Sequence, residues 1–431
     1  MSPANAVLAA LGRDGLEAEV YRKRGRSRRI EVQERGGGRA QLAVEEGWAI
    51  RAGGVRGAFF LAGSGEPPTA GPWPALAGGA LRLPAPVAAE PWRAPAALDT
   101  PLLSESEGRA LVEGLSRELG RELPDARLLA AVLEDGASES QLVASTGIDA
   151  TWRQRGAWLR AEAALGPARA TLEVVERNAQ ALAPRALARR LADLLHVLAA
   201  ERTAERDRGT MLIAPPLGAR LLAALTPALV GPTAVPLLAQ LGDVRARVAT
   251  DAVTIVDDGR LEGGVLAAPY DGEGLPTGRV VLVERGIARQ PLLAWWQVVA
   301  GSTARPSGCA RRASWRDVPR PGPTQLYLEP REDKTVAQLL AAVARGFYLL
   351  DAVGAVRIDF ARNRFAVPVC GFAVQDGRAL APVSRAWLAG AVSALLLGIE
   401  GVGRDLTFLP LDGLIGSPSL LVGGLELRPT P

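Results

Sequence analysis

Short segments with high β-propensity, separated by glycine-rich breaks, recur along most of this 431-residue chain. Four of them follow one another over residues 16–62, which predicts a β meander, and another group fills residues 127–175. The second half adds more runs of this kind, among them VTIVDD, RVVLVERG, TQLYLEP and RFAVPVCGFAVQDG. Sheets are therefore expected to make up most of the fold.

Helical periodicity is confined to a few segments. Ser104 and Glu107 have the spacing of a capping box, and leucines at helical intervals follow them. One apolar face also runs along residues 183–206, which predicts a second helix. Further helices are expected from about residue 217, over 335–346 and near 383–399.

Together these patterns predict an α+β fold, in which sheets and helices are segregated. Residues 1–205 are expected to form an N-terminal α/β domain with a β meander and helices. Within it, residues 63–102 are rich in proline, alanine and glycine and predict a long irregular connection. Residues 206–431 are expected to form a C-terminal β-rich domain with a few helices.

Composition and charge narrow the class of protein. The chain is 48% hydrophobic, and its formal net charge of +4 is small for this length, so no direct nucleic-acid partner is expected. Two cysteines cannot build a disulfide framework, and the first residues lack the basic segment of a secretory signal, which favours the cytoplasm. Residues 221–242 carry no charge, but three prolines argue against a membrane-spanning helix.

Several ordered motifs in the second half carry a family resemblance. They are DDGRLEGGVLAAPYDGEGLPTGRVVLVERG, TQLYLEP, FAVPVCGFAVQDGRALAPVS, GVGRDLTF and SPSLLVGGLEL. In this order the motifs resemble the TldD/PmbA family, also called TldD/TldE, of bacterial and archaeal proteins. The N-terminal half agrees more loosely, through LEAEVYRKRGRSRRIEVQERG.

The resemblance also shows what this chain lacks. In the family, the TldD-like branch carries H-E-x-x-x-H on a helix, and a cysteine closer to the C-terminus supplies a third zinc ligand. The corresponding helix here lies within residues 211–229, which contain no His, Glu, Asp or Cys, and His196 is the one histidine of the chain. Three protein ligands are typical of a catalytic zinc site. The resemblance therefore places the chain in the PmbA/TldE-like branch, with no catalytic residue and no metal ligand of its own.

The function that this resemblance implies is that of a non-catalytic subunit. Its partner would be a TldD-like metalloprotease subunit that carries H-E-x-x-x-H and the zinc, and together they would cleave unfolded peptides or peptide precursors. The alternative is a homodimer that binds peptides or proteins without chemistry. Family members have also been described as modulators of DNA gyrase, but no helix-turn-helix pattern in this sequence favours direct DNA binding.

The segment 257–279 combines five carboxylates with six glycines. It matches neither an EF-hand loop nor a phosphate-binding loop. We expect a glycine-rich loop between two strands, whose carboxylates hold the loop by hydrogen bonds or line a cleft. For the second case the candidate peptide-contacting residues are Asp271, Glu273, Gly274, Thr277 and Arg279.

The sequence gives weaker support for a functional role of the other reactive side chains. His196 is expected to be a partly buried or surface residue of a helix, with a ligand or base as the alternative, and Cys370 is expected in an apolar strand. Cys309 is flanked by arginine, which could lower the pKa of its thiol. A divergent hydrolase that uses this thiol, or the neighbouring carboxylates of Asp257 and Asp258, is a third hypothesis.

Two further features of the sequence are considered as contacts for a partner: a basic run and a pair of tryptophans. The run RKRGRSRR at 22–29 alternates along an expected strand and predicts a solvated face, with an acidic or nucleic-acid partner as the alternative. Trp295 and Trp296 are expected to anchor a core or a subunit interface rather than to stack on bases.

Overall fold

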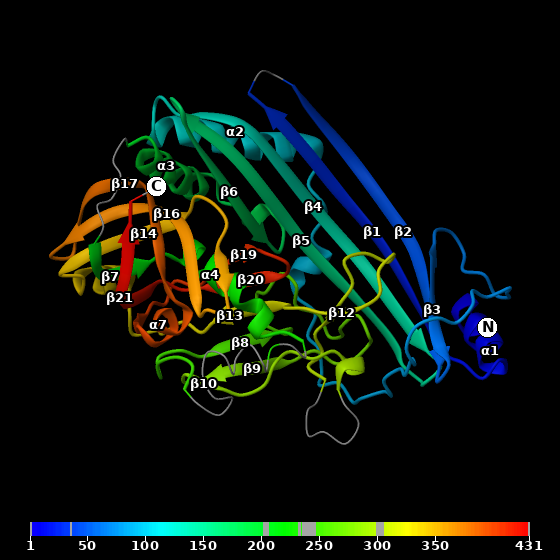
Figure 1. Ribbon diagram of the computed structural model, residues 1–431. Helices are drawn as coiled ribbons and strands as arrows, with labels where there is room; N and C mark the ends of the chain where they lie inside the picture. Colours follow the sequence, from blue (N-terminus) through cyan, green and yellow to red (C-terminus); the bar gives the residue numbers. More distant parts are fainter. Residues whose placement is uncertain are drawn as a thin grey trace.

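The fold is α+β, as the sequence predicts, and consists of a long N-terminal sheet beside a β-rich C-terminal region (Figure 1). The computed structural model describes residues 2–34, 37–200, 207–231, 234, 247–298 and 306–429. The predicted domain boundary at 205/206 lies outside these ranges and stays a prediction.

The N-terminal sheet is antiparallel and has the strand order β3-β2-β1-β4-β5-β6. Its strands are β1 (Glu17–Gln33), β2 (Gly38–Gly54), β3 (Gly57–Gly63), β4 (Arg127–Ala144), β5 (Asp149–Leu165) and β6 (Ala168–Glu176). The sequence predicts shorter strands here, with two segments each over 16–35 and 127–146. Each of these pairs is one continuous strand, because β1 and β4 are bonded to neighbours on both sides along almost their whole length.

Two helices cover one end of this sheet: α2 (Glu105–Glu122) and α3 (Pro184–Leu198). The capping box is confirmed, because the Ser104 hydroxyl accepts a hydrogen bond from the Glu107 backbone N–H and the Glu107 carboxylate accepts one from the Ser104 backbone N–H. A third helix, α1 (Pro3–Arg13), packs at the other end and was not anticipated from the sequence.

The connection over 63–102 is irregular, as expected, apart from a bridge between Ala58 and Ala77 and the 3-10 turn η1 (Ala96–Asp99). A second 3-10 turn, η2 (Ala179–Ala181), leads into α3.

The C-terminal region contains two larger sheets, and its main core packs residues of both together. The first has the order β10-β9-β8-β13-β20-β19 and consists of β8 (Ile255–Asp258), β9 (Arg279–Glu284), β10 (Ile287–Ala288), β13 (Gln325–Leu328), β19 (Thr407–Pro410) and β20 (Leu414–Ser417). A separate two-stranded sheet pairs β11 (Ala310–Arg311) with β12 (Arg320–Pro321).

The second large sheet has the order β14-β7-β21-β17-β16-β15, with β18 paired to β21. Its strands are β7 (Asp207–Ile213), β14 (Arg345–Ala352), β15 (Arg357–Asp359), β16 (Arg364–Gln375), β17 (Arg378–Ala391), β18 (Ile399–Val402) and β21 (Leu420–Arg428). Because β14 also pairs with β16, the strands β14, β7, β21, β17 and β16 close into a ring.

The helices of this region are short. Those in the described part of the region are α4 (Pro215–Leu225), the 3-10 turns η3 (Thr226–Ala228) and η4 (Trp295–Gln297), α6 (Val336–Ala341) and α7 (Val392–Leu397). The helix predicted over 335–346 is thus shorter, since β14 begins at Arg345. The helix predicted over 183–206 ends at Leu198, and residues 201–206 lie outside the described ranges.

The helix predicted near 383–399 is wrong for most of its length. Residues up to Ala391 belong to β17, which pairs with β16 on one side and β21 on the other. Only Val392–Leu397 are helical. Hydrogen bonding from two neighbouring strands overrides the apolar, alanine- and leucine-rich composition of this stretch.

No helix among the described residues is long and apolar enough to cross a membrane. In the uncharged stretch 221–242, α4 ends at Leu225 and η3 follows it. Residues 232–233 and 235–242 of that stretch lie outside the described ranges.

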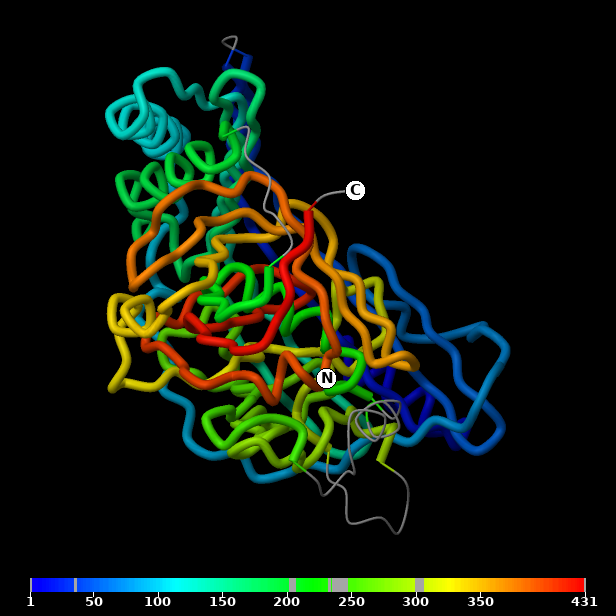
Figure 2. Tube along the Cα trace, turned by 60° about the vertical axis from the view of Figure 1, so that its left-hand side comes forward, coloured from blue at the N-terminus to red at the C-terminus, as the bar shows by residue number. Residues whose placement is uncertain are grey.

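The two halves of the chain pack directly against each other. Figure 2 shows the C-terminal region beside the long blue-to-green strands of the N-terminal sheet. At this junction Trp315 is buried, and its indole N–H donates to Glu45 of β2 at 3.1 Å. The ring lies against the backbone of Gly47, where an added Cβ would come within 2.2 Å of it.

Replacement of Gly47 by alanine should displace this ring and destabilise the protein. Overpacking of this kind typically costs about 1–3 kcal/mol, so the thermal-unfolding midpoint of Gly47→Ala should fall by about 1–3 °C for a chain of this length. The matched control is Gly54→Ala in the same strand, where an added Cβ meets nothing within 4 Å. Equal midpoints for the two variants would contradict the close packing at Gly47.

Candidate functional site

The carboxylate- and glycine-rich segment 257–279 lies at the junction of the two halves. It leaves the C-terminal region at the end of β8 and returns at the start of β9, and between them it contacts the N-terminal sheet. Gly274 has a φ of +77° and packs against Leu142 of β4 and against Ile148. A side chain at this position would be both strained and obstructed.

Asp271 holds the loop by backbone hydrogen bonds. Its Oδ1 accepts from the N–H groups of Glu273 and Leu275 at 2.9 and 3.0 Å, and its Oδ2 accepts from Ala310 at 3.1 Å. Burial, together with the nearby Glu273 carboxylate, raises the pKa of Asp271 to about 7, against the lowering effect of these donors. The expected alternative of a carboxylate that closes the loop is thus confirmed for Asp271.

Four buried charged side chains connect this loop to the N-terminal sheet. Arg51 of β2 lies 2.9 Å from Glu19 of β1 and 3.3 Å from Glu273. Arg312, which follows β11, also pairs with Glu19. These four residues are called the junction cluster below. It joins strands near the N-terminus to loops far along the chain.

The pKa values within the junction cluster follow from its geometry. Burial alone would raise the pKa of Glu19, but Arg51 and Arg312 together hold it below its ordinary value. Glu273 faces Arg51 and the N–H of Trp295, and burial leaves its pKa raised. Two carboxylates therefore share the charge of Arg51, and loss of that arginine would leave them facing each other.

A pocket of about 240 Å³ opens beside the junction cluster. Aromatic rings form one wall, with Trp152 of β5 about 6.2 Å from Tyr21 and 6.4 Å from Tyr270, measured between ring centroids. The guanidinium of Arg312 lies 4.6 Å from the centre of the Tyr21 ring. We call this cavity the junction pocket. Its other lining residues include Lys23, Gln154, Asp271, Gly272, Thr277, Arg311 and Thr324.

The junction pocket combines aromatic rings with cationic and amide side chains. Burial lowers the pKa of Lys23, against the effect of the nearby Glu45. Tyr21 and Lys23 are two positions apart on β1, as are Trp152 and Gln154 on β5, so each pair faces the same side of the sheet. Lys23 belongs to the basic run at 22–29, but no local pattern in the sequence indicates Tyr21, Trp152 or Gln154, because only the pairing of β1, β4 and β5 brings these residues together.

The five candidate peptide-contacting residues are not all together. Asp271 and Thr277 line the junction pocket. Glu273 and Gly274 are buried against the N-terminal sheet, and Arg279 lies at the start of β9, where it pairs with Glu329. Contact of any of these residues with a peptide stays a prediction.

The carboxylates of Asp257 and Asp258 have different partners. Asp257 accepts from the backbone N–H of Thr324 at 2.8 Å, and burial raises its pKa to about 7. Asp258 accepts from the backbone N–H of Arg260 at 2.8 Å. No hydrogen bond joins the two carboxylates among the contacts described, so this geometry gives no support to an acid–base pair.

The two thiols are buried. A lowered pKa was considered for Cys309, but burial and the carboxylates of Asp271 and Asp257 raise it well above its ordinary value. The neighbouring arginine at 311 is directed elsewhere, since Arg311 is bonded to the Pro323 carbonyl. Cys370 is a fully buried residue of β16, as predicted, and burial raises its pKa to about 12.

The remaining candidates lie on the surface. His196 is exposed on α3, with its ring stacked on Phe372 at 6.5 Å. Trp296 is 54% exposed, whereas Trp295 is half-buried beside Glu273.

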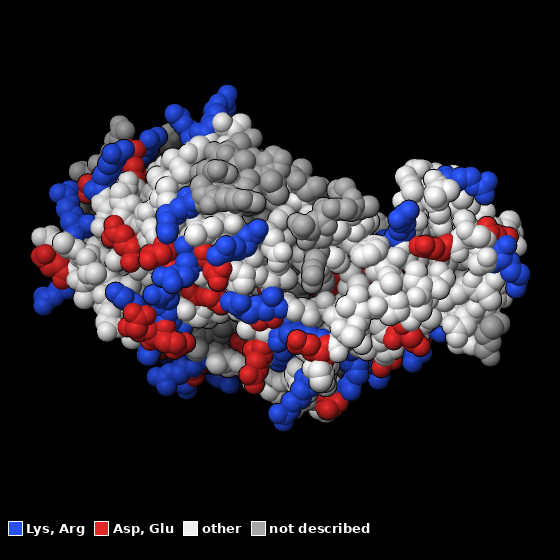
Figure 3. Space-filling model, turned by 90° about the horizontal axis from the view of Figure 1, so that it is seen from below, with Lys and Arg blue, Asp and Glu red and all other residues white. Residues whose placement is uncertain are grey.

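The basic run on β1 is a solvated face in part, as expected. Arg24 pairs with Glu46, and Arg29 pairs with Glu31 and Glu134. On the face shown in Figure 3, basic and acidic side chains are interspersed.

The helix that would carry zinc in the TldD-like branch corresponds to α4. Its one ionisable side chain is Arg220, which pairs with Asp351 at 2.8 Å. An added Cβ at Gly218 would come within 2.3 Å of the Ser417 hydroxyl, so the helix packs closely on β20. Among the described residues, no three His, Cys, Asp or Glu side chains form a metal-binding group. The donor set on α4 therefore does not fit zinc.

Removal of Arg51 should destabilise the junction cluster strongly. Breaking a buried ion pair typically costs about 3–5 kcal/mol, so the urea midpoint of Arg51→Met should fall markedly. The control Arg24→Met removes an exposed pair on the same sheet, which contributes about 0–1 kcal/mol. When Glu273→Gln is added to Arg51→Met, the urea midpoint of the double variant should recover part of the loss that Arg51→Met causes. A midpoint for Arg51→Met no lower than that of Arg24→Met would contradict the importance of the cluster.

The raised pKa of Asp257 predicts a pH dependence. The folded protein retains a proton that the unfolded chain releases between about pH 4 and 7, so folding becomes less favourable as pH rises through this window. The side-chain amide of the Asp257→Asn variant does not titrate. The stability of the wild type relative to Asp257→Asn should therefore fall between about pH 4.5 and 7, by at most about 1.4 kcal/mol per pH unit. If the stabilities of the two proteins change in parallel with pH across this range, the raised pKa of Asp257 is contradicted.

Solved structures of similar fold come from several organisms. The structure of TldE from Thermococcus kodakarensis superposes with a TM-score of 0.86 at 17% identity, covering 99% of this chain and 100% of that one. A proposed modulator of a DNA gyrase from Thermotoga maritima superposes with a TM-score of 0.83, also at 17% identity, and each chain is covered to 99%. At this identity the likeness establishes the fold.

Sequence relatives cover less of the chain. A metalloprotease TldD homolog of Buchnera aphidicola (subspecies Schizaphis graminum) is 26% identical over 174 residues, which are 40% of this chain and 35% of that protein. The corresponding homolog of Haemophilus influenzae is 26% identical over 205 residues, covering 44% and 41%. The matched stretches thus span less than half the length of these relatives. The family model of the PmbA/TldA metallopeptidase C-terminal domain matches residues 207–428, just over half of the chain. The chain therefore belongs to the TldD/PmbA family of metallopeptidase-like proteins.

Proposed function

We propose that this chain is a TldE-like, non-catalytic subunit of a two-subunit metallopeptidase. A TldD-like partner would carry H-E-x-x-x-H, bind the zinc and cleave unfolded peptides or peptide precursors. The proposal goes beyond family membership, because it assigns a partner and a role to this particular chain.

The composition and packing of α4 carry the proposal. A catalytic zinc needs three protein ligands, and the glutamate of the family motif would serve as general base. In this chain α4 has apolar side chains and one arginine, and that arginine is paired with Asp351. With a single histidine in 431 residues, the family's two-histidine motif cannot form within one copy.

The junction pocket supports a role in holding the peptide. Lys23 offers a hydrogen-bond donor to a carbonyl or a carboxylate group, and the rings of Tyr21, Trp152 and Tyr270 offer an apolar wall. Hydrogen bonds to the main chain of a peptide bind it with little dependence on its sequence. In the proposed complex, this chain would thus contribute substrate binding and the partner would contribute the chemistry.

Co-expression with a TldD-like subunit tests the proposal. The two chains should co-purify, and chelator-sensitive peptide cleavage should require both of them. Replacement of the partner's motif histidines by alanine should abolish cleavage. The matched variant His196→Ala of this chain should leave cleavage unchanged, because His196 is an exposed residue of α3 outside the junction pocket.

Two outcomes would overturn the proposal. Chelator-sensitive cleavage by the purified chain alone would assign it a metal site of its own. A stable homodimer that binds peptides and is indifferent to any TldD-like partner would favour the alternative of a self-standing binding module. Light scattering and peptide-binding titrations on the same preparation distinguish these outcomes.

A further inference from the structure

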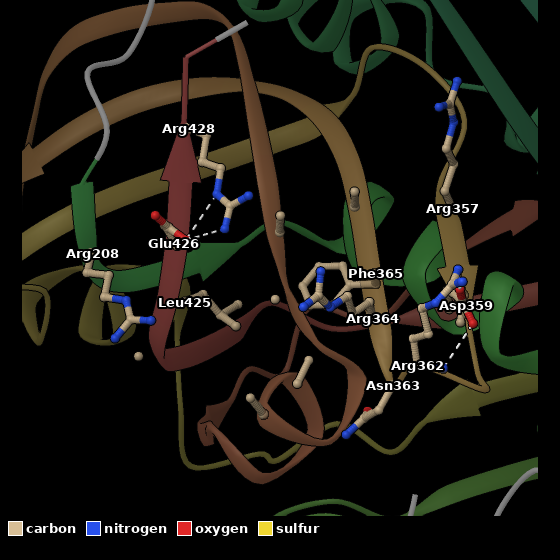
Figure 4. A pocket seen from close by; sticks show the side chains of 17 residues that line it. Arg208, Arg357, Asp359, Arg362, Asn363, Arg364, Phe365, Leu425, Glu426 and Arg428 are labelled. Carbon is tan, nitrogen blue, oxygen red and sulfur yellow. Dashed lines mark hydrogen bonds and ion pairs between the residues drawn. The ribbon is translucent and has the colours of Figure 1, made fainter. Parts of the chain in front are cut away.

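A second and larger cavity lies in the C-terminal region, away from the junction pocket. Its volume is about 730 Å³, and five arginines and two carboxylates line it. Figure 4 shows these side chains around the ends of β21 and β16. The lining arginines are Arg208, Arg357, Arg362, Arg364 and Arg428. We call this cavity the arginine pocket.

Strand register explains why a hollow forms at this place. Arg208, Glu426, Ala389, Ala366 and Arg357 are directly opposite one another on five successive strands, from β7 to β15. Residues in register on neighbouring strands point to the same face of a sheet. Long side chains thus stand at the two ends of this row, and two alanines occupy its middle.

The neighbouring row differs, because it carries charge on β16 as well as on β15. There Ala391 of β17 lies opposite Arg364 of β16, which in turn lies opposite Asp359 of β15. Gly390 and Ala394 also line the cavity. The small residues Ala366, Ala389 and Gly390 therefore leave a shallow apolar patch in the floor of the cavity, where a ligand can approach the backbone of the sheet closely.

The pocket carries an excess of positive charge, because its five arginines outnumber its two carboxylates. The two carboxylates are already engaged, since Asp359 pairs with Arg362 at 3.0 Å and Glu426 pairs with Arg428 at 2.7 Å. Arg357 lies 5.9 Å from the centre of the Trp387 ring. All five arginines are exposed and therefore accessible to an anionic partner.

The spacing of these arginines indicates the shape of the ligand. Neighbouring strands lie about 4.8 Å apart, so the row from β7 to β15 is about 19 Å long when it is followed along the curved sheet. In Figure 4, Arg208 and Arg357 are far apart on the two sides of the view, and Arg364 lies between them. A compact anion such as phosphate would reach only part of this row. An extended chain with several carboxylates would reach all of it, because its side chains on one face repeat every ~7 Å.

We propose that the arginine pocket binds an extended acidic peptide segment, which lies across the strands on the alanine floor. The small floor residues admit the peptide backbone, and the arginines pair with its Asp or Glu side chains. This site is independent of the junction pocket and of any metal, so it can be tested on the chain alone.

Fluorescence anisotropy with a labelled peptide tests the proposal. The probe is the hexapeptide Ala-Glu-Ala-Glu-Ala-Glu, and the neutral control replaces each Glu by Gln. The acidic peptide should bind and the neutral one should not, and added salt should weaken binding. Inorganic phosphate should compete poorly. Equal binding of the two peptides, or no binding of either, would overturn the proposal.

Matched variants locate the site. Arg208→Ala with Arg364→Ala should weaken binding of the acidic peptide by about tenfold, through loss of two charge-assisted contacts. The control is Arg331→Ala with Arg378→Ala, two exposed arginines outside the pocket, whose loss changes the net charge equally. A third variant, Ala389→Leu, should weaken binding by filling the floor without any change in charge.

The same variants separate this site from a subunit interface. If the two double variants weaken peptide binding equally, the effect comes from the change in net charge, and the assignment of the site is wrong. The assignment is also wrong if Arg208→Ala with Arg364→Ala blocks association with a TldD-like subunit but leaves peptide binding intact. Co-purification measured beside anisotropy distinguishes the two results, and circular dichroism confirms that each variant is folded.

Discussion

The junction cluster is the interaction on which the arrangement of the two halves depends. Arg51 lies between Glu19 and Glu273, and Arg312 completes the set from the C-terminal side. Burial of charge is unfavourable unless every group has a partner. The N-terminal sheet and the glycine-rich loop are therefore held in one relative position, and the junction pocket forms as a consequence of that position.

Much of the fold could be predicted from local sequence patterns. The helix at Ser104 was predicted because capping and apolar spacing are local signals, and the strand-rich segments were predicted from alternation. The length of β1 was not, because two shorter strand-prone segments were expected in its place. They form one strand because β1 is paired with β2 on one side and β4 on the other along almost its whole length. The prediction of a helix near 383–399 was wrong for a related reason, since the pairing of this segment with β16 and β21 decides its structure.

The candidate site could be predicted only in part. Asp271 stabilises its own loop, and the sequence already offered that role. The partner of Glu273 is Arg51, 222 positions away, and no local pattern indicates such a contact. The arginine pocket was missed for the same reason: its arginines come from strands β7, β15, β16 and β21 and the turn before β16, and they are scattered in the sequence. The lack of zinc ligands on α4, in contrast, can be recognised from composition alone.

The strand ring of the C-terminal region constrains when this region can fold. β7 opens the region, and its partners in the ring are β14 and β21, which form much later in synthesis. Since β21 lies between β7 and β17, the ring stays open until Leu420–Arg428 have left the ribosome. The N-terminal sheet needs no residue beyond β6 for its own strand pairing. The nascent chain would thus present a finished sheet beside an unfinished ring, a period in which chaperones or a partner subunit can act.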